Sequence, residues 1–192
     1  MEDQSEQTNP PRTILDTFEN VPPGVRELYK KVREPFVIAQ AVLDKPQFTQ
    51  AEALSLTQPR LDSGVLQNWV NKGTVEFIGP KDSPGKRRLY CGRDVILICA
   101  LQQARTLGLP MKLAGFLAEV TSIRAEEMLG IKGRGMTPDQ SLIIHLDESG
   151  DWKVSGIYGA IEYSDLPETF AVLRTDVLIE RVLEGLSQMM DS

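Results

Sequence analysis

The stretch FTQAEALSLTQPRLDSGVLQNWVNKG (Phe48–Gly73) decides the fold of this chain. Its first part, TQAEALSL, begins with Thr49, which is a residue type suited to the N-cap of a helix. We expect a short helix from there to about Leu56, where the proline in QPRLD prevents its continuation. The second part, SGVLQNWVNKG, begins directly after this turn. The stretch therefore predicts two short helices joined by a tight turn.

The second of these helices is predicted to be amphipathic. Leu66, Trp69 and Val70 follow one another at i, i+3 and i+4, so they share the face that turns toward the core. Gly73 stands just past the last helical turn, where a left-handed residue commonly ends a helix. Two helices in this arrangement, with polar residues on the outer side of the second, have the outline of a helix-turn-helix.

The outer side of the second helix carries amide side chains, which suit the reading of DNA. Gln and Asn form paired donor and acceptor bonds with adenine in the major groove. A lysine at the end of the helix suits a contact with phosphate. We therefore expect Gln67, Asn68 and Asn71 to contact bases, and Lys72 to contact the DNA backbone.

A basic hairpin is predicted after the second helix. TVEFIG alternates like a strand, KDSPGK has the composition of a turn, and RRLYC returns as a second strand. Such a hairpin resembles the wing of a winged helix, which lies along phosphates. We expect four of its residues to contact the DNA backbone: Lys86, Arg87, Arg88 and Tyr90.

The charge distribution supports a specific anionic partner. The whole chain has a net charge of -6, but residues 45–110 carry nine Lys/Arg and five Asp/Glu, a balance of +4. Residues 1–44 have a balance of -3, and residues 111–192 have a balance of -7. A local positive segment in an acidic protein favours a specific contact over general adhesion to polyanions.

Three segments resemble the MerR-type winged helix family: VLQNWVNKGTV (65–75), RLYCGRDV (88–95) and ALQQARTLGLPMKLA (100–114). The resemblance covers about residues 47–120, and it implies a winged helix-turn-helix that binds DNA. The matching positions are Leu66, Trp69, Gly73, Arg88, Tyr90, Asp94 and Leu107-Gly108-Leu109.

The chain also departs from that family. Gln67 stands where these proteins usually have Arg, and Asn68 replaces the first aromatic residue of the helix. Cys91 and Cys99 do not match the cysteines of the family's metal sensors, so metal sensing is not expected. The long antiparallel dimerisation helix of the family is missing as well, because the helical stretch stops near Gly130.

The remaining chain divides by composition. We expect a flexible arm over 1–23, a DNA-binding domain with two N-terminal helices over 24–130, a linker over 131–140 and a small α/β module over 141–192. In the module, SLIIHLD and WKVSGIYG predict a hairpin, and TFAVLR predicts a third strand. Thr175 is a candidate N-cap for a closing helix, whose apolar face would contain Val177, Leu178, Val182, Leu186 and Met189. The fold class is therefore α+β.

Scarce histidine and cysteine argue against an enzyme. The chain has one histidine, His145, and two cysteines, Cys91 and Cys99, which is too few for a structural zinc site. The sequence contains no P-loop and no dinucleotide fingerprint. We expect no catalytic residues, no cofactor and no metal, and the absence of a long apolar run predicts no membrane span. The acidic, polar N-terminus is unlike a secretory signal, which favours the cytoplasm.

These patterns predict a DNA-binding transcriptional regulator that acts as a homodimer through residues 141–192. The expected partner is double-stranded DNA, with RNA polymerase or a small-molecule effector as a further partner. Two alternatives stay open at this level. One is an architectural or recombination accessory factor similar to an excisionase, and the other is a protein-interaction adaptor that uses a winged helix.

Overall fold

The computed structural model describes residues 42–74, 76–77, 87–128, 141–157 and 168–190. All of these belong to one compact unit, Ala39–Ser192. The predicted arm over 1–23, the first of the two predicted N-terminal helices and the predicted linker over 131–140 lie outside the described residues. So does the turn of the predicted basic hairpin, including Lys86.

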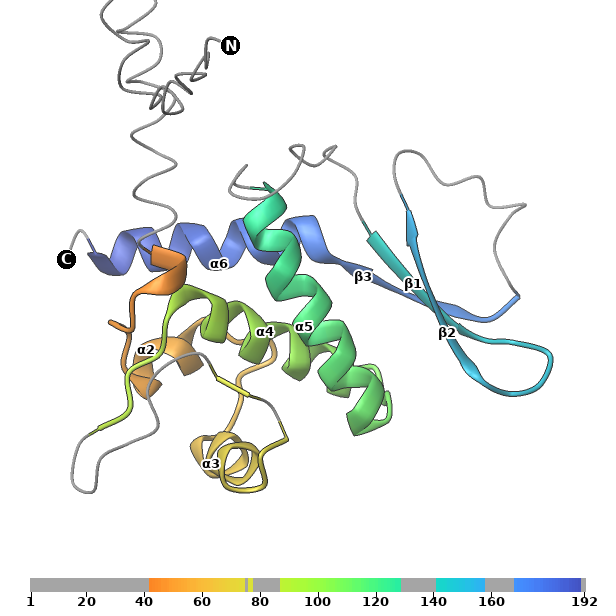
Figure 1. Ribbon diagram of the computed structural model, residues 1–192, viewed down its shortest axis with the longest axis horizontal. Helices are drawn as coiled ribbons and strands as arrows, with labels where there is room; N and C mark the ends of the chain where they lie inside the picture. The colour runs from red at the N-terminus through yellow and green to blue at the C-terminus, as the bar shows by residue number, and fades with distance from the viewer. Residues whose placement is uncertain (1–41, 75, 78–86, 129–140, 158–167, 191–192) are drawn as a thin grey trace, which may run out of the picture. The chain divides into compact units, whose positions relative to one another are not determined.

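Helices dominate the described chain, and one small sheet lies near its C-terminus (Figure 1), so the predicted α+β class is confirmed. Residues 42–44 are also helical. None of the described helices is both long enough and apolar enough to cross a lipid bilayer. The elements are α2 (Gln50–Ser55), α3 (Ser63–Asn71), α4 (Gly92–Thr106), α5 (Met111–Met128), β1 (Ser141–Leu146), β2 (Trp152–Ile157), β3 (Phe170–Arg174) and α6 (Thr175–Met190).

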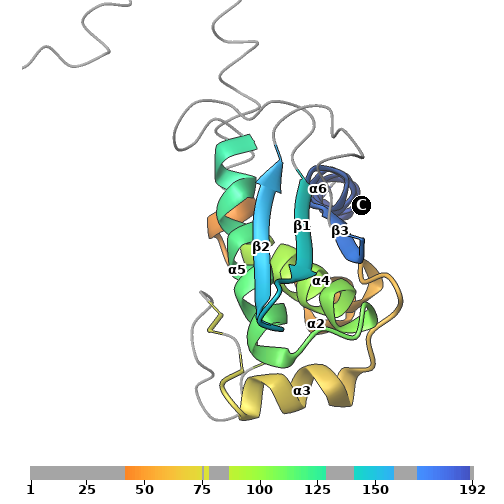
Figure 2. The same cartoon turned by 90° about the vertical axis from the view of Figure 1, so that its right-hand side faces the viewer.

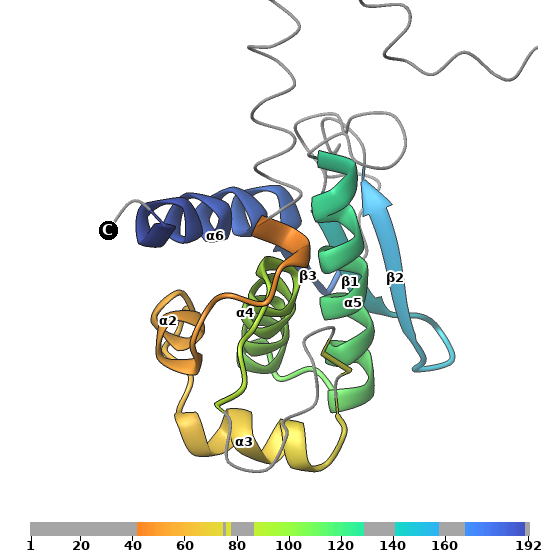
Figure 3. The same cartoon turned by 60° about the vertical axis from the view of Figure 1, so that its left-hand side comes forward.

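The central element is α4. Its middle reads VILICAL, which has no polar face, and every residue of this run is buried. Such a helix is stable in water only when other elements cover it all round. Figure 3 shows α4 between α2 and α5, with α6 crossing above it. The closest packing partners of α4 are α5 and α6.

The sheet is antiparallel and has the strand order β2-β1-β3 (Figure 2). β1 pairs with β2 in a register that places Ile144 opposite Val154, as the predicted hairpin requires. The predicted third strand is also present, since β3 pairs with the other edge of β1. Leu142 and Ile144 point to one face of the sheet and are part of the same apolar core as α4.

The closing helix is present as predicted, but one predicted core residue is wrong. Val177 is 48% exposed, whereas Leu178, Val182 and Leu186 are buried. In the sequence of α6, two apolar faces overlap. The direction in which the chain leaves β3 decides which of these faces is buried. Thr175 is the first residue of α6 and not its N-cap, and its hydroxyl accepts a hydrogen bond from Arg124 Nη1 at 3.3 Å.

The apolar face of α6 packs within its own chain. Its buried residues belong to one continuous cluster with those of α3, α4 and α5, and α6 contacts both α4 and α5. Residues of α6 therefore complete the core that surrounds α4. The helical face that suggested a dimer through residues 141–192 is occupied by this intramolecular packing.

A half-buried arginine joins three parts of the unit. Arg93, in the first turn of α4, donates from Nε to Asp44 Oδ1 at 2.7 Å. The same guanidinium forms an ion pair through Nη1 with Glu126 of α5, whose side chain is almost completely buried. Arg93 therefore fixes residues 42–44 and the C-terminal half of α5 to the start of α4.

We expect Arg93→Ala to lower the free energy of unfolding by about 3–5 kcal/mol, because the Glu126 carboxylate then stays buried without the Arg93 charge. Urea unfolding followed by circular dichroism measures this change. The double variant Arg93→Ala/Glu126→Gln removes both charges and is expected to be more stable than Arg93→Ala alone. A double variant that is less stable than Arg93→Ala would contradict this role of the ion pair.

Gly92 permits the close approach of residues 42–43 to α4. A β-carbon at Gly92 would lie 2.7 Å from the Val42 carbonyl oxygen, which is backbone and must shift to make room. We expect Gly92→Ala to lower the free energy of unfolding by about 1–3 kcal/mol. Gly115→Ala in α5 is the matched control, since its β-carbon would meet nothing nearer than 3.9 Å. Because alanine favours a helix, the control should be neutral or stabilising by up to about 1 kcal/mol.

Candidate nucleic-acid interface

The first helix of the candidate site begins at a well-formed cap. The Thr49 hydroxyl accepts a hydrogen bond from the Glu52 backbone N–H at 3.3 Å, which confirms the predicted N-cap. In return, the Thr49 backbone N–H donates to Glu52 Oε2 at 2.6 Å. The Thr49 hydroxyl also donates to Glu52 Oε2 at 2.8 Å. The backbone N–H and the hydroxyl of Thr49 together hold the pKa of the Glu52 carboxyl below its ordinary value. This reciprocal cap fixes the start of α2 in spite of its short length.

The turn between α2 and α3 is held by Thr57. Its buried hydroxyl donates to the Leu54 carbonyl at 2.8 Å and accepts from the Leu61 backbone N–H, also at 2.8 Å. Asp62 then caps α3 by accepting from the Gly64 backbone N–H at 2.7 Å. These bonds determine the angle at which α3 leaves α2.

α3 has the orientation that its sequence predicts. Leu66 and Trp69 are buried, Val70 is half-buried, and Gly73 ends the helix region with a φ of 59°. Trp69 is only 3% exposed, and the Arg105 guanidinium of α4 lies 5.4 Å from its ring centroid. This contact fixes α3 against the end of the central helix.

The back of the turn rests on α4 and α6. Gln102 of α4 donates from Nε2 to the Pro59 carbonyl at 3.3 Å, and the Cys99 thiol lies 3.5 Å from the Leu56 carbonyl. Gly185 of α6 gives space for the Leu56 side chain, with which a β-carbon there would collide. Both helices therefore support the α2–turn–α3 unit from the side opposite to solvent.

The three predicted base-contacting residues lie on the solvent side of α3, and the predicted phosphate contact Lys72 is its C-cap. Gln67, Asn68, Asn71 and Lys72 are all exposed. Gln67 Nε2 donates to Asn71 Oδ1 at 3.0 Å, so these two amides are aligned by a bond of i, i+4 spacing. That bond uses one donor and one acceptor, and each amide keeps a second polar group for another contact.

A groove of about 970 Å³ runs between α2, the turn, α3 and the segment 87–90. Of the four predicted residues of α3, Gln67 lines this groove, and Asn68, Asn71 and Lys72 do not. Its lining contains three cations and one anion, which gives this surface a positive balance. The charged lining residues are Arg60, Arg87, Arg88 and Asp62.

The two ends of the predicted hairpin lie side by side. The rings of Phe77 and Tyr90 meet edge to face with centroids 5.6 Å apart, and the Arg88 guanidinium lies 5.0 Å from the Phe77 centroid. The described residues 76–77 and 87–89 are not in strands. Tyr90 instead pairs with Phe48, and its backbone N–H donates to the Phe48 carbonyl at 2.7 Å.

Arg87, Arg88 and Tyr90 differ in accessibility. The Arg87 side chain is exposed, Arg88 is half-buried against the two aromatic rings, and Tyr90 is 1% exposed. Tyr90 therefore lies in the core, where its ring supports Arg88 at 5.8 Å. Lys86, the remaining predicted contact of this hairpin, is outside the described residues.

Sequence reasoning did not select Arg60 as a site residue. Arg60 is exposed in the turn between α2 and α3, and it lines the same groove as Arg87. A cation in the turn of a predicted helix-turn-helix was the available signal. The folded turn decides the direction in which such a side chain points, and its sequence does not.

The two cysteine thiols are unsuited to act as nucleophiles or metal ligands. Burial raises the pKa of Cys91 to about 11 and that of Cys99 to about 12, so both stay protonated near neutral pH.

Within the ranges that the structure describes, no three His, Cys, Asp or Glu side chains converge as a metal site would require. His145 is half-buried in β1, and its Nδ1 lies 3.2 Å from the Leu146 carbonyl.

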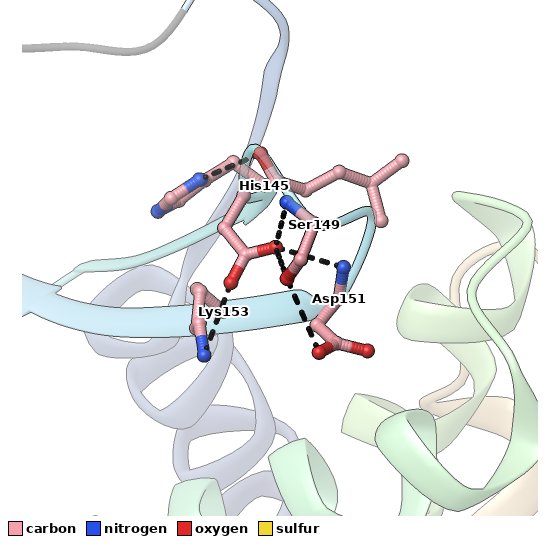
Figure 4. A network of polar contacts seen from close by, with 6 residues as sticks. His145, Ser149, Asp151 and Lys153 are labelled. Carbon is pink, nitrogen blue, oxygen red and sulfur yellow. Dashed lines mark hydrogen bonds and ion pairs between the residues drawn. The ribbon is translucent and has the colours of Figure 1, made fainter.

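A second polar cluster closes the turn between β1 and β2 (Figure 4). Asp147 Oδ1 accepts from the Ser149 hydroxyl at 2.6 Å, from the Ser149 N–H at 3.0 Å and from the Asp151 N–H at 2.9 Å. Its other oxygen pairs with Lys153 Nζ at 3.2 Å. The carboxylate is occupied by groups of its own turn, which indicates a structural role.

A comparison with models of known protein families found no match, and a comparison with curated proteins found no significantly similar sequence. The likeness to MerR-type proteins therefore rests on the residues that carry it.

The turn at Asp147 should make stability depend on pH. Hydrogen bonds from the Ser149 side chain and the Asp151 backbone hold the pKa of Asp147 well below its ordinary value of 3.8. A carboxyl group whose pKa is lowered by folding stabilises the fold above that ordinary value, and the contribution is lost as pH falls below it. We expect Asp147→Asn to be less stable than the wild type at pH 7, with a smaller loss of stability between pH 4 and pH 2. Urea unfolding at a series of pH values measures both, and parallel profiles would contradict this expectation.

Proposed function

We propose that this chain is a sequence-specific DNA-binding protein that regulates transcription in the cytoplasm and acts as a homodimer. The observation that carries the proposal is the groove beside α3. It combines the exposed Gln67 amide with the positive lining formed by Arg60, Arg87 and Arg88. A polar helix face next to cations is the arrangement that serves base reading together with phosphate contact.

The proposed architecture is a winged helix-turn-helix. α2 and α3 supply the helix pair. The contact of Phe77 with Tyr90 brings together the two described ends of the predicted hairpin and so supports the wing. In this arrangement, Arg88 is held by the two rings at the base of the wing. The buried Tyr90 then acts as a support for the wing, and the exposed cations make the phosphate contacts.

The α3 amides are proposed to read bases. Gln67 and Asn71 are already joined by a hydrogen bond, which reduces the entropy lost when they are fixed against a base edge. Asn68 and Lys72 are exposed on another part of the same helix. We assign Asn68 to a neighbouring base and Lys72 to a phosphate at the end of the helix.

The cation prediction concerns affinity. Arg60→Ala and Arg87→Ala should each weaken binding to specific and random duplexes alike, because phosphate contacts carry no sequence information. The slope of log affinity against log salt should become shallower by about 0.9 for each phosphate that the variant no longer neutralises. Fluorescence anisotropy at several salt concentrations measures this slope. Lys153→Ala removes an exposed cation far from the groove in sequence and is the matched control. A slope that changes equally in the control would contradict the assignment.

The amide prediction concerns specificity. Gln67→Ala and Asn71→Ala should each cost about 1–3 kcal/mol on the preferred site and leave binding to random DNA almost unchanged. The preferred site comes from selection of random duplexes with the purified wild-type protein. Trp69→Ala serves as a folding reference, since removal of a buried aromatic side chain costs about 3–5 kcal/mol of stability. Equal losses on preferred and random DNA would contradict base reading by α3.

The same experiments separate the alternative functions. A protein that binds and bends its site without changing transcription from a nearby promoter is an architectural or recombination accessory factor. A protein that selects no duplex at low salt is a protein-interaction adaptor. RNA polymerase and a small-molecule effector are the further partners that a regulator of this kind would have.

A further inference from the structure

α5 carries an exposed stripe that runs along most of its length. The α5 stripe consists of Lys112, Phe116, Ile123 and Glu127, whose directions fall within about 40° of that of Phe116 on an ideal helix. Lys112, Phe116 and Ile123 are exposed, and Glu127 is half-buried. Phe116 is 51% exposed and Ile123 is 57% exposed. Leu113 and Val120 lie beside them, half-buried and packed against the core.

The apolar residues of this surface have the spacing of a helix-pairing seam. Leu113, Phe116, Val120 and Ile123 alternate by three and four residues, as the a and d positions of a coiled coil do. Single exposed apolar residues are ordinary on a protein surface. Two large ones separated by seven residues, with Leu113 and Val120 on the same side, form a continuous line that suits a second helix.

The charges at the ends of the stripe are not explained by the stability of α5 itself. Lys112 lies in the first turn and Glu127 in the last turn of the helix. Each has the sign that the helix dipole disfavours at its position, since the N-terminus favours anions and the C-terminus favours cations. A partner that brings an anion to Lys112 and a cation to Glu127 would relieve both.

A second copy of α5 supplies that partner when it runs in the opposite direction. A two-fold axis midway between Glu119 and Val120 sets Phe116 opposite Ile123 of the second copy. The same axis sets Lys112 opposite Glu127 of the second copy, and the reverse pair forms at the other end. A parallel pair would instead bring Lys112 next to Lys112 of the other chain, so charge selects the antiparallel arrangement.

We propose that the α5 stripe is the surface through which two copies of this chain associate, with their α5 helices antiparallel. This names the contact for the homodimer suggested above, and it does not require DNA binding. None of the groove residues belongs to α5, so the groove and the α5 stripe are formed by different parts of the chain. The dimer through α6 that the sequence suggested would need an apolar face that is already buried in the chain.

The contact should be weak. α5 has 18 residues, which corresponds to a length of about 27 Å. One helix pair of this length belongs to the small class of interfaces, below about 1,200 Å² in total. We therefore expect a dissociation constant in the micromolar range, and a monomer–dimer equilibrium that sedimentation can follow between 1 and 300 μM of full-length protein without DNA.

A charge-reversal experiment tests the proposed pairing. Lys112→Glu gives a chain with two anionic ends, and Glu127→Lys gives a chain with two cationic ends. Each variant alone should dimerise more weakly, with a dissociation constant raised by about tenfold or more. An equimolar mixture should form a heterodimer at least as readily as the wild type dimerises. A wild type that stays monomeric to 300 μM, single variants that dimerise like the wild type, or a mixture that does not associate would each overturn the proposal.

Thermal unfolding shows whether the variants are folded. Both charge reversals follow the helix dipole, so their melting temperatures at low protein concentration should be equal to that of the wild type or slightly higher. A clear decrease of the melting temperature would overturn the inference that these residues serve association and not the fold. Because the assay contains no DNA, failure of the dimer and failure of DNA binding are separate results.

Crosslinking tests the position of the axis. Val120→Cys places two thiols close to the axis, and mild oxidation should produce a disulfide-linked dimer. Lys112→Cys is the matched control, because its two copies would lie about 22 Å apart along the helices. That separation exceeds the reach of a disulfide, roughly 7 Å between Cα atoms. Efficient crosslinking of the control, or none of Val120→Cys, would overturn the antiparallel register.

Discussion

The structure depends on one constraint, which is that α4 has no polar face. Its apolar residues point in every direction around the helix, so water must be excluded on all sides. α2, α5 and α6 provide this cover, and α6 comes from the far end of the chain. A segment that looks like a separate C-terminal module is therefore needed to complete the core of the N-terminal helices.

The same constraint gives the candidate interface its rigidity. α4 contacts the α2–α3 turn through Gln102 and holds Trp69 through Arg105. With these contacts behind it, α3 can present an almost entirely polar face to solvent without losing its position. A helix of nine residues would be marginal by itself in water, and its packing supplies the stability that its length does not.

Charge acts differently in the interior and on the surface. Inside, Arg93 pairs with Glu126 and links elements that are far apart in sequence. On the surface, Arg60 and Arg87 are exposed in the groove beside α3, and the stripe on α5 has opposite charges at its two ends. The first arrangement holds the fold together, whereas the other two are suited to partners outside the chain.

The sequence by itself determined the local features. The cap at Thr49, the inward face of α3, the β1–β2 hairpin and the third strand all follow from spacing and turn chemistry, which act over a few residues. Only the tertiary structure decided that α6 packs on α4, that Val177 is exposed and that Arg60 joins Arg87 at one groove. These depend on the path of the chain between distant segments. Periodicity restricts which face of a helix can be buried. Which element buries that face is determined by the packing of all the helices and the sheet on one core.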